Sequence, residues 1–465
     1  MKLMAIIRIM KTYSRYIFIA LALYFQNIAF SLVSNFVFIP SFLEFLAVLS
    51  LVIIISRYRF HKYIFSFWIF LYFIHFSFIS YFGVTITVND IYLFFTHSIE
   101  SFETFFYTLD IYFTPFIISI FSLLIVLSIK VNTVVKNIYF LTFILIFWLL
   151  VSSIKIGDAS FLLLRATYET SSLNLKTQVP KVDADSPKAF KKGEFNIVLV
   201  IGESMRAREF QERDYEMFEQ GFYKTIYSGA TSTDVSVPLL LNGASRASKI
   251  DLSNNLFHLA KLNGYETYFI STQSKKSMQY IEPYMMKKSI SHYDILGSRE
   301  DSDLIEELKK IDFNDSDTEF VVMQMQGQHS PYKYYPTYIK STIPQQYAAS
   351  MKYSNALILE MMNYVKSLKT ATLFIFTSDH GELLGESGRV GHNKFHEKIY
   401  RVPMIIASNV NTVFDYEKIL LHSGVYNLIY YFLGYAKEYK EEKKPIRING
   451  SMISEEDGFR MMESN

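Results

Sequence analysis

The sequence predicts an N-terminal transmembrane domain of five helices followed by an α/β domain in which helices flank a mostly parallel sheet. Two observations lead to this fold class. The first 155 of the 465 residues are dense in Phe, Ile, Leu and Tyr, whereas the remainder has an ordinary globular composition. In that remainder, apolar runs of strand length alternate with helical segments, the pattern of a parallel-rich sheet. The predicted strands cover 196–202, 266–271, 318–327, 370–378 and 402–408, and the predicted helices 255–263, 304–311, 347–368 and 419–433. The predicted boundaries are a transmembrane domain over 1–155, a linker over 156–193 and the α/β domain over 194–465.

The transmembrane domain rests on five apolar segments, each close to the roughly 20 residues that a helix needs to cross a bilayer. They cover residues 16–35, 37–56, 63–82, 112–129 and 138–154. Lys and Arg precede the first segment and occupy the second-to-third and fourth-to-fifth connections, whereas the third-to-fourth connection has acids but no Lys or Arg. Because positively charged loops stay in the cytoplasm, residues 156–465 are expected outside it. A buried core helix is the alternative for any one segment.

Three further stretches have patterns of their own. The loop at 83–111 is rich in Phe and Tyr with acids between them, which is typical of an amphipathic helix lying on a membrane. Residues 156–171 are expected to form a short helix, and the Pro-, Asp- and Lys-rich stretch 172–192 a solvated tether. The tail after Lys437 is charged and weakly patterned.

Polar side chains follow three buried strands of the predicted sheet. The strands at 196–202, 318–327 and 370–378 are followed by Glu203, by Gln328-His329 and by Asp379-His380. Because ligands bind at the carboxyl edge of such sheets, these side chains are expected in one polar site. The chain has no Cys, so a metal there would be held by carboxylate, imidazole and hydroxyl groups. Zinc suits such a set, and manganese is the alternative.

A loop of small and hydroxyl residues runs through Gly229–Asp234 into an apolar stretch, as at the start of a helix. Backbone N–H groups and the helix dipole favour an anion such as phosphate there, and a metal can turn a hydroxyl into a nucleophile. A plain helix N-cap is the alternative. His329 and His392 are placed to bind phosphate or to protonate a leaving oxygen, although a lone loop histidine is usually only a surface residue.

Taken together, these motifs resemble the bacterial phosphoethanolamine transferases of the alkaline phosphatase/sulfatase superfamily. The motifs that carry the resemblance are Gly202–Ala207, Thr231–Pro238, Gln328–Pro331, Ser378–Glu386 and Gly391-His392. The resemblance implies an alkaline phosphatase/sulfatase-like fold for the α/β domain and a multi-pass protein of the bacterial inner membrane with its catalytic domain in the periplasm. It also implies transfer of phosphoethanolamine from phosphatidylethanolamine to lipid A or another lipopolysaccharide or glycan group, through a phosphothreonine intermediate.

The resemblance also assigns roles to single residues. Thr233 would be the nucleophile and a metal ligand, and Glu203, Asp379 and His380 would complete a zinc site. His329 and His392 would hold the phosphoryl group or a second zinc ion, so one or two Zn²⁺ are expected. The chain departs from the family in having no cysteines beside the nucleophile and in a short segment after His392, which leaves the acceptor open.

Three other functions fit parts of the pattern. A phosphoglycerol transferase acting on phosphatidylglycerol would share the spans, the metal and the Thr nucleophile. A sulfatase would need Arg where Leu240 stands, in a motif that begins at Cys or Ser. A catalytically inactive membrane scaffold would not need Glu203, Thr233, Asp379 and His380. A net charge of +2 does not indicate a nucleic-acid partner.

Overall fold

The computed structural model of the protein describes most of the chain in two compact units. The described residues are 2–34, 37–38, 42–82, 85–96, 109–129, 158–172, 186–211, 215–297, 300–313, 318–332, 335–337, 339–386, 389–412, 414–439, 445–453, 455 and 458–462. One unit comprises Met1–Leu173 with Glu386–Val390, and the other comprises Asn174–Gly385 with Gly391–Asn465. Each unit is described by itself below.

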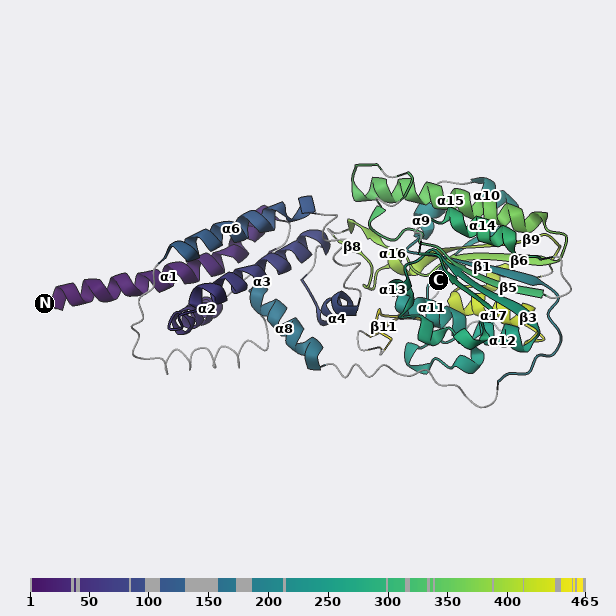
Figure 1. The fold of residues 1–465 in the computed structure, drawn as a ribbon, viewed down its shortest axis with the longest axis horizontal. Coiled ribbons are helices and arrows are strands. Elements are labelled where there is room, and N and C mark those ends of the chain that lie inside the picture. Colours follow the sequence, from purple (N-terminus) through teal and green to yellow (C-terminus); the bar gives the residue numbers. More distant parts are fainter. Residues whose placement is uncertain are drawn as a thin grey trace. The chain divides into compact units, whose positions relative to one another are not determined.

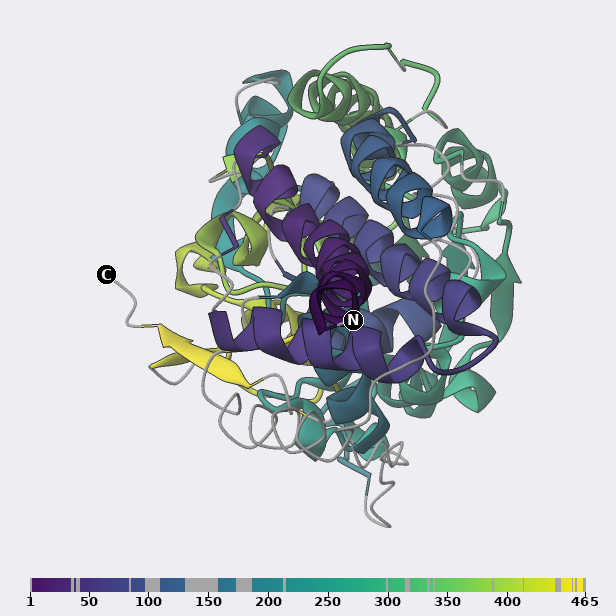
Figure 2. The ribbon, with the colours of Figure 1, turned by 90° about the vertical axis from the view of Figure 1, so that its left-hand side faces the viewer.

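The first unit is helical. Its elements are α1 (Lys2–Val33), α2 (Phe42–Ile55), α3 (His61–Phe82), α4 (Val88–Thr96), the 3₁₀ turn η1 (Leu109–Tyr112), α6 (Phe113–Ser128) and α8 (Ala159–Ser172). Helix α1 packs against α2 and α6, and α3 packs against α6 and α8 (Figure 2). Large aromatic side chains fill the contacts, and the rings of Phe30 and Phe76 are stacked with centroids 4.3 Å apart.

Two of its helices are long and apolar enough to cross a membrane: Ser14–Val33 within α1, and α3. They coincide with the first and third predicted spans. The second and fourth spans are apolar helices of only 14 and 16 residues, α2 and α6. At 1.5 Å per residue these reach about 21 and 24 Å, short of the roughly 30 Å hydrocarbon core. The fifth predicted span, 138–154, lies outside the described residues, so two of the five predicted spans are supported.

A buried carboxylate fixes the start of α8. Asp158 accepts hydrogen bonds from Asn27 Nδ2 at 2.7 Å, from Tyr72 Oη at 2.5 Å and from Ser160 Oγ at 2.6 Å. The Ser160 backbone N–H also donates to Asp158, which therefore caps the helix. Helix α8 confirms the helix expected at 156–171, and α4 lies within the loop where an amphipathic helix was expected.

The second unit is built on a seven-stranded sheet with the order β2-β9-β6-β1-β5-β3-β4 (Figure 1). The strands are β1 (Asn196–Gly202), β2 (Phe222–Tyr227), β3 (Tyr265–Ser271), β4 (His292–Ile295), β5 (Thr318–Gln324), β6 (Thr372–Ser378) and β9 (Arg401–Ser408). Strand β9 runs antiparallel to β6 and β2, and the other neighbours are parallel. This confirms the predicted mostly parallel sheet.

Helices cover both faces of this sheet. One face packs against α11 (Thr233–Asn242), α12 (Leu256–Leu262) and α17 (His422–Phe432), and the other against α14 (Ser302–Lys310) and α15 (Ile343–Ser367). Residues of β1 alternate between the two cores, with Leu199 in one and Val200 in the other. Because both faces are covered, all seven residues of β1 are buried, which explains its continuous apolar run.

The remaining described elements of this unit are short. They are α9 (Ala207–Gln211), α10 (Tyr215–Gln220), α13 (Lys275–Met278), α16 (Glu397–Tyr400), and two-stranded ribbons formed by β7 (Leu383–Leu384) with β8 (Val390–Gly391) and by β10 (Ile446–Asn449) with β11 (Phe459–Met462). The β10–β11 ribbon, yellow in Figure 2, lies in the tail after Lys437, where the weak sequence pattern predicted no element. Its signal is weak because only Ile446 and Ile448 supply buried apolar side chains to a neighbouring core.

Candidate active site

The first site residue, Glu203, follows β1 in a tight turn. Ser204 has φ +56°, a left-handed conformation that is unfavourable for a residue with a side chain. The turn is held by the Ser204 N–H, which donates to Asp379 Oδ1 at 2.9 Å, and by the Met205 N–H, which donates to Ser378 Oγ at 2.8 Å. Gly327 packs so closely that a Cβ there would lie 2.5 Å from the Glu203 nitrogen. The surroundings therefore fix Glu203, which is 2% exposed.

The next two residues follow the neighbouring strand β6. Asp379 and His380 are fully buried. The Nδ1 of His380 lies 2.8 Å from the Gly381 carbonyl oxygen, so Nδ1 carries the proton and donates to it. This tautomer leaves the Nε2 lone pair directed at the two carboxylates, 3.4 Å from Glu203 Oε1 and 3.5 Å from Asp379 Oδ2. It is the arrangement expected of a histidine that binds a metal.

Thr233 completes the group from a different element. It is the first residue of α11, directly after the N-cap Ser232. Its Oγ1 lies 2.7 Å from Asp379 Oδ2, 3.0 Å from Glu203 Oε2 and 3.2 Å from His380 Nε2. The structure therefore brings together the four residues that the sequence singled out as a metal site.

These four donors are close enough together to share one small cation, although three of the five separations given above are shorter than in a tetrahedral zinc site. A zinc ion about 2.0–2.1 Å from each of four ligands separates the ligand atoms by about 3.3–3.5 Å. The distances between the donors given above run from 2.7 to 3.5 Å. Among the described residues, Glu203, Asp379 and His380 are the His and carboxylate group that fits a metal ion. The donor set of two carboxylates, one imidazole and one hydroxyl fits zinc.

The electrostatics of the site also favour a divalent cation. Burial raises the pKa of Glu203 well above its usual range, and the nearby Asp379 carboxylate acts in the same direction. Burial opposes ionisation of Asp379 too, but hydrogen bonds, including those with Glu203 and Thr233, lower the pKa of Asp379 overall. Burial lowers the pKa of His380, which favours a neutral ring. A bound cation would stabilise both carboxylates in the ionised form.

His392 lies beside this group. Its ring centroid is 4.4 Å from that of His380, and its Nδ1 is 3.9 Å from Glu382 Oε1. Glu382 is itself fixed, because Tyr332 Oη donates to its Oε2 at 2.8 Å. The Glu382 carboxylate therefore faces the His392 imidazole. The sequence motif contains Glu382, but its partnership with Tyr332 was not foreseen.

His329 lies in the loop after β5, at the same carboxyl edge of the sheet. The Gln328 N–H donates to the Glu203 carbonyl oxygen at 2.7 Å, which ties this loop to the first ligand. The Nδ1 of His329 is 2.6 Å from its neighbour's carbonyl oxygen, that of Ser330. Asp301, a buried residue that the sequence did not single out, accepts from the N–H groups of Gln326 and Gly327 and holds the loop from behind.

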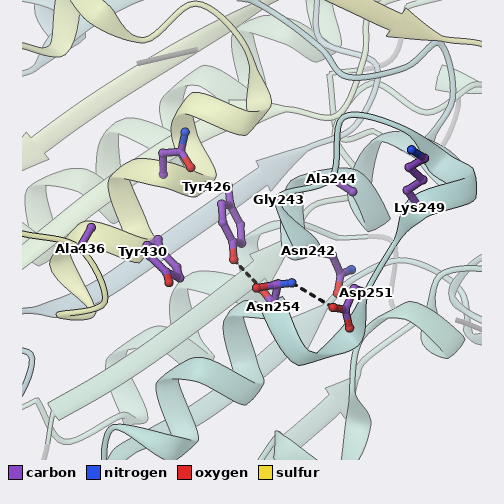
Figure 3. Close-up of a pocket in the computed structure, with 10 residues that line it drawn as sticks. Asn242, Gly243, Ala244, Lys249, Asp251, Asn254, Tyr426, Tyr430 and Ala436 are labelled. Carbon is purple, nitrogen blue, oxygen red and sulfur yellow. Dashed lines mark hydrogen bonds between the residues drawn. The ribbon is translucent and has the colours of Figure 1, made fainter. Parts of the chain in front are cut away.

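A separate pocket of about 300 Å³ opens at the opposite end of α11 (Figure 3). Its lining includes Asn242 and Gly243 at the end of the helix, and the stacked rings of Tyr426 and Tyr430 from α17. Helix α11 has ten residues, which places this pocket about 15 Å from Thr233. None of the candidate site residues lines it.

Comparisons with known proteins agree with this geometry. Residues 195–423 match the Sulfatase family model. Lipooligosaccharide phosphoethanolamine transferase A (EptA) from Neisseria meningitidis, an integral membrane protein, is similar with a TM-score of 0.64 and 13% identity, over 92% of this chain and 97% of that chain. The chain's sequence has no match among curated proteins.

Two periplasmic domains are similar at lower TM-scores. That of phosphoethanolamine transferase EptC from Campylobacter jejuni has a TM-score of 0.44 and 19% identity, over 54% of this chain and 96% of that one. The periplasmic domain of EptC from Escherichia coli, in complex with Zn, has a TM-score of 0.49 and 15% identity, over 61% of this chain and 96% of that one. The resemblance inferred from the motifs is confirmed: residues 195–423 match the Sulfatase family model, and a phosphoethanolamine transferase is among the chain's structural neighbours. The likeness to EptA shows a shared fold that extends over the N-terminal helices.

Proposed function

We propose that the protein is a metal-dependent phosphoethanolamine transferase, because residues 195–423 match the Sulfatase family model. Its donor is phosphatidylethanolamine, and its acceptor is lipid A or another envelope glycan group. The observation that carries the proposal is the position of Thr233 Oγ1, 2.7–3.2 Å from one donor atom each of Asp379, Glu203 and His380. A hydroxyl at a helix start among these ligands has the surroundings of an activated nucleophile.

The chemistry proceeds in two displacements. Zn²⁺ held by Glu203, Thr233, Asp379 and His380 would lower the pKa of the Thr233 hydroxyl and offset charge on the phosphoryl group. Thr233 Oγ1 forms a bond to phosphorus as the bond to the diacylglycerol oxygen breaks, which leaves phosphoethanolamine on Thr233. An acceptor hydroxyl then displaces Thr233. Two steps suit two large amphiphiles, since donor and acceptor need not be bound together.

Two histidines contact the oxygens around phosphorus in this proposal. His392, with Glu382 behind it, and His329 contact the phosphoryl oxygens, and one of them gives a proton to the departing diacylglycerol oxygen. A second Zn²⁺ at these histidines is the alternative role. A neutral alcohol leaves far more readily than an alkoxide, so this proton transfer is needed in the first displacement.

We expect His329→Ala and His392→Ala to lower turnover by about 10²–10⁴-fold, the range for loss of a general acid, while most of the metal stays bound. Turnover and metal content of the purified variants check this. His258→Ala is the matched control, because His258 is a partly buried histidine hydrogen-bonded to Ser186 and Ser289 on another part of the domain. Loss of all metal in either test variant would make that histidine a primary ligand instead.

The proposed setting is the bacterial inner membrane, with residues 1–155 as a five-span domain, 156–193 as a linker and 194–465 as the periplasmic catalytic domain. Two helices long and apolar enough to cross a bilayer support an anchor. The arrangement keeps the site near a phospholipid surface, so the donor phosphate need not leave the interface completely.

The topology is expected to place the chain end outside the cytoplasm. A reporter active only in the periplasm, fused after Asn465, should be active, because an odd number of spans follows a cytoplasmic N-terminus. A reporter fused in the 57–62 connection, rich in Arg and Lys, is the control and should be inactive. Activity with the opposite pattern would overturn both the span count and the orientation.

The donor is tested directly with labelled lipids. Full-length protein loaded with zinc is supplied with phosphatidylethanolamine or phosphatidylglycerol in detergent micelles, and diacylglycerol release is measured. Release from phosphatidylethanolamine alone is expected. Release from phosphatidylglycerol alone would identify a phosphoglycerol transferase, and release from neither would favour an inactive scaffold. Mass spectrometry of envelope lipids and glycans, with and without the gene, then identifies the acceptor by a mass increment of one phosphoethanolamine.

A further inference from the structure

One residue in the loop before Thr233, Gly229, is held through both of its flanking peptide groups by distant parts of the chain. The Gly229 N–H donates to Nδ1 of His422 at 3.3 Å. The Gly229 carbonyl oxygen accepts from the backbone N–H and from Nδ2 of Asn449, both at 2.9 Å. His422 lies 193 positions from Gly229, and Asn449 lies 220 positions from it.

His422 links the peptide group between Ser228 and Gly229 to the strand end that carries the metal ligand Asp379. It is the first residue of α17 and is 1% exposed. Its Nε2 lies 2.9 Å from the carbonyl oxygen of Ser378, the residue before Asp379. Burial lowers the pKa of His422 to about 4, so the ring is neutral and has one donor and one acceptor. Nε2–H donates to Ser378, and Nδ1 accepts from Gly229. One ring therefore connects the Asp379 strand end to the Thr233 loop.

Asn449, from the β10–β11 ribbon, holds the peptide group on the other side of Gly229. It is 1% exposed, and besides Gly229 its Nδ2 donates to the Ser245 carbonyl oxygen at 3.2 Å. Arg447 Nε donates to its Oδ1 at 3.0 Å, which fixes the orientation of the amide. Asn449 also forms an isolated parallel bridge with Ala230. The ribbon thus braces the loop that has no disulfide in this Cys-free chain.

The braced loop leads without interruption into the site. Ser228 Oγ lies 2.5 Å from the Asp379 carbonyl oxygen and 2.6 Å from that of Ala230, and its single proton is donated to one of them. The Asn393 N–H donates to the Thr231 carbonyl oxygen at 3.1 Å, and Ser232 Oγ donates to that of Ser451 at 3.3 Å. Since misplacing a reacting atom by about 1 Å can cost about 100-fold in rate, these contacts bear on catalysis as well as on stability.

We propose that His422 and Asn449 are positioning residues that hold Gly229, and through it the Thr233 hydroxyl, in register with Glu203, Asp379 and His380. The inference rests on the proposed transfer reaction for its kinetic consequence. Neither residue touches the reacting atoms, so each acts on the rate of the chemical step and leaves donor affinity unchanged.

The test measures single-turnover formation of the phosphoethanolamine adduct in full-length, zinc-loaded protein. His422→Leu removes both hydrogen bonds and is expected to slow adduct formation by about 10–100-fold, as for other supporting residues, with metal content and donor KM unchanged. His422→Gln, whose amide keeps one donor and one acceptor, is expected to restore most of the rate. Asn449→Asp keeps the size of the side chain but loses both Nδ2 donations, and is expected to slow the step by about 10-fold.

Asn409→Ala is the matched control. Asn409 also makes three hydrogen bonds to backbone, with Leu368, Thr370 and Thr372, but at the opposite end of β6. It is expected to lower the melting temperature without changing the rate. The double variant His422→Leu/Asn449→Asp is expected to be less than multiplicatively impaired, because both changes release the same residue, Gly229. Multiplicative losses, wild-type rates, or a similar rate loss in Asn409→Ala would each overturn the proposal.

Hydrogen exchange separates this inference from the proposed function. In His422→Leu, amides of the segment 229–233 should exchange faster than in the unaltered protein, whereas those of β6 should not. Unchanged exchange in that segment would refute the brace even if the transfer assay fails. If the unaltered protein forms no adduct but the segment 229–233 exchanges faster in His422→Leu, the proposed reaction is refuted and the positioning role of His422 stands.

Discussion

Thr233→Ala is expected to abolish the covalent adduct and to lower diacylglycerol release by about 10⁴-fold or more, the scale seen when a hydrolase loses its nucleophile. Its Oγ1 lies among Glu203, Asp379 and His380, and removal of this oxygen leaves no group to receive the phosphoryl unit. Mass spectrometry of protein incubated with phosphatidylethanolamine and no acceptor checks this. The peptide containing Thr233 should gain one phosphoethanolamine in the unaltered protein, and the same peptide of Thr233→Ala should not.

Ser236→Ala is the matched control for this experiment. Ser236 lies one helical turn further along α11, is fully buried, and its Oγ has no hydrogen-bond partner in the described part of the chain. Removal of a buried hydroxyl that makes no hydrogen bond costs little stability. The variant should therefore keep both adduct and release. An adduct on Ser232 or Ser236, or undiminished transfer by Thr233→Ala, would show that Thr233 is not the nucleophile.

Removal of any one of three proposed metal ligands is expected to have the second large effect on activity. Glu203→Ala, Asp379→Ala and His380→Ala are each expected to lower metal occupancy and to lower activity more than about 100-fold, since loss of even an outer-shell partner costs about 10–100-fold. Elemental analysis of each purified variant, alongside turnover, checks this. Retained metal and activity in one variant would remove that residue from the site.

Metal affinity is also expected to fall as pH falls. Burial, with Asp379 nearby, raises the pKa of Glu203, so a proton competes with the cation at pH values where an exposed glutamate is already ionised. Asp301→Asn serves as the control, because Asp301 is a buried carboxylate that accepts hydrogen bonds from Thr272, Gln326 and Gly327 and is not one of the four proposed metal ligands. Its effect on the pH dependence of zinc binding should be small. A pH-independent affinity in the unaltered protein would contradict the proposed protonation of Glu203.

The periodicity of the sequence determined much of the second unit. Apolar runs and amphipathic segments predicted β1, β3, β5, β6 and β9 and helices α12, α14, α15 and α17, because both faces of the sheet are covered and each helix has one buried side. The same pattern brought Glu203, His329 and Asp379 to one edge, since parallel strands end together. Strands β2 and β4 were not predicted, because they lie at the edges of the sheet and are only partly buried.

Only the tertiary structure decided which loop meets that edge and how it is held. Thr233 follows β2, which reaches the sheet by antiparallel pairing with β9, and no local pattern specifies that partner. His422 and Asn449 act through hydrogen bonds to the backbone of Gly229, roughly 200 positions away. Every residue has a backbone N–H or carbonyl group, so the identity of the residue at position 229 does not reveal that its backbone binds these two side chains. Sequence alone therefore indicated the chemistry of the site, and folding across the whole domain decided its geometry.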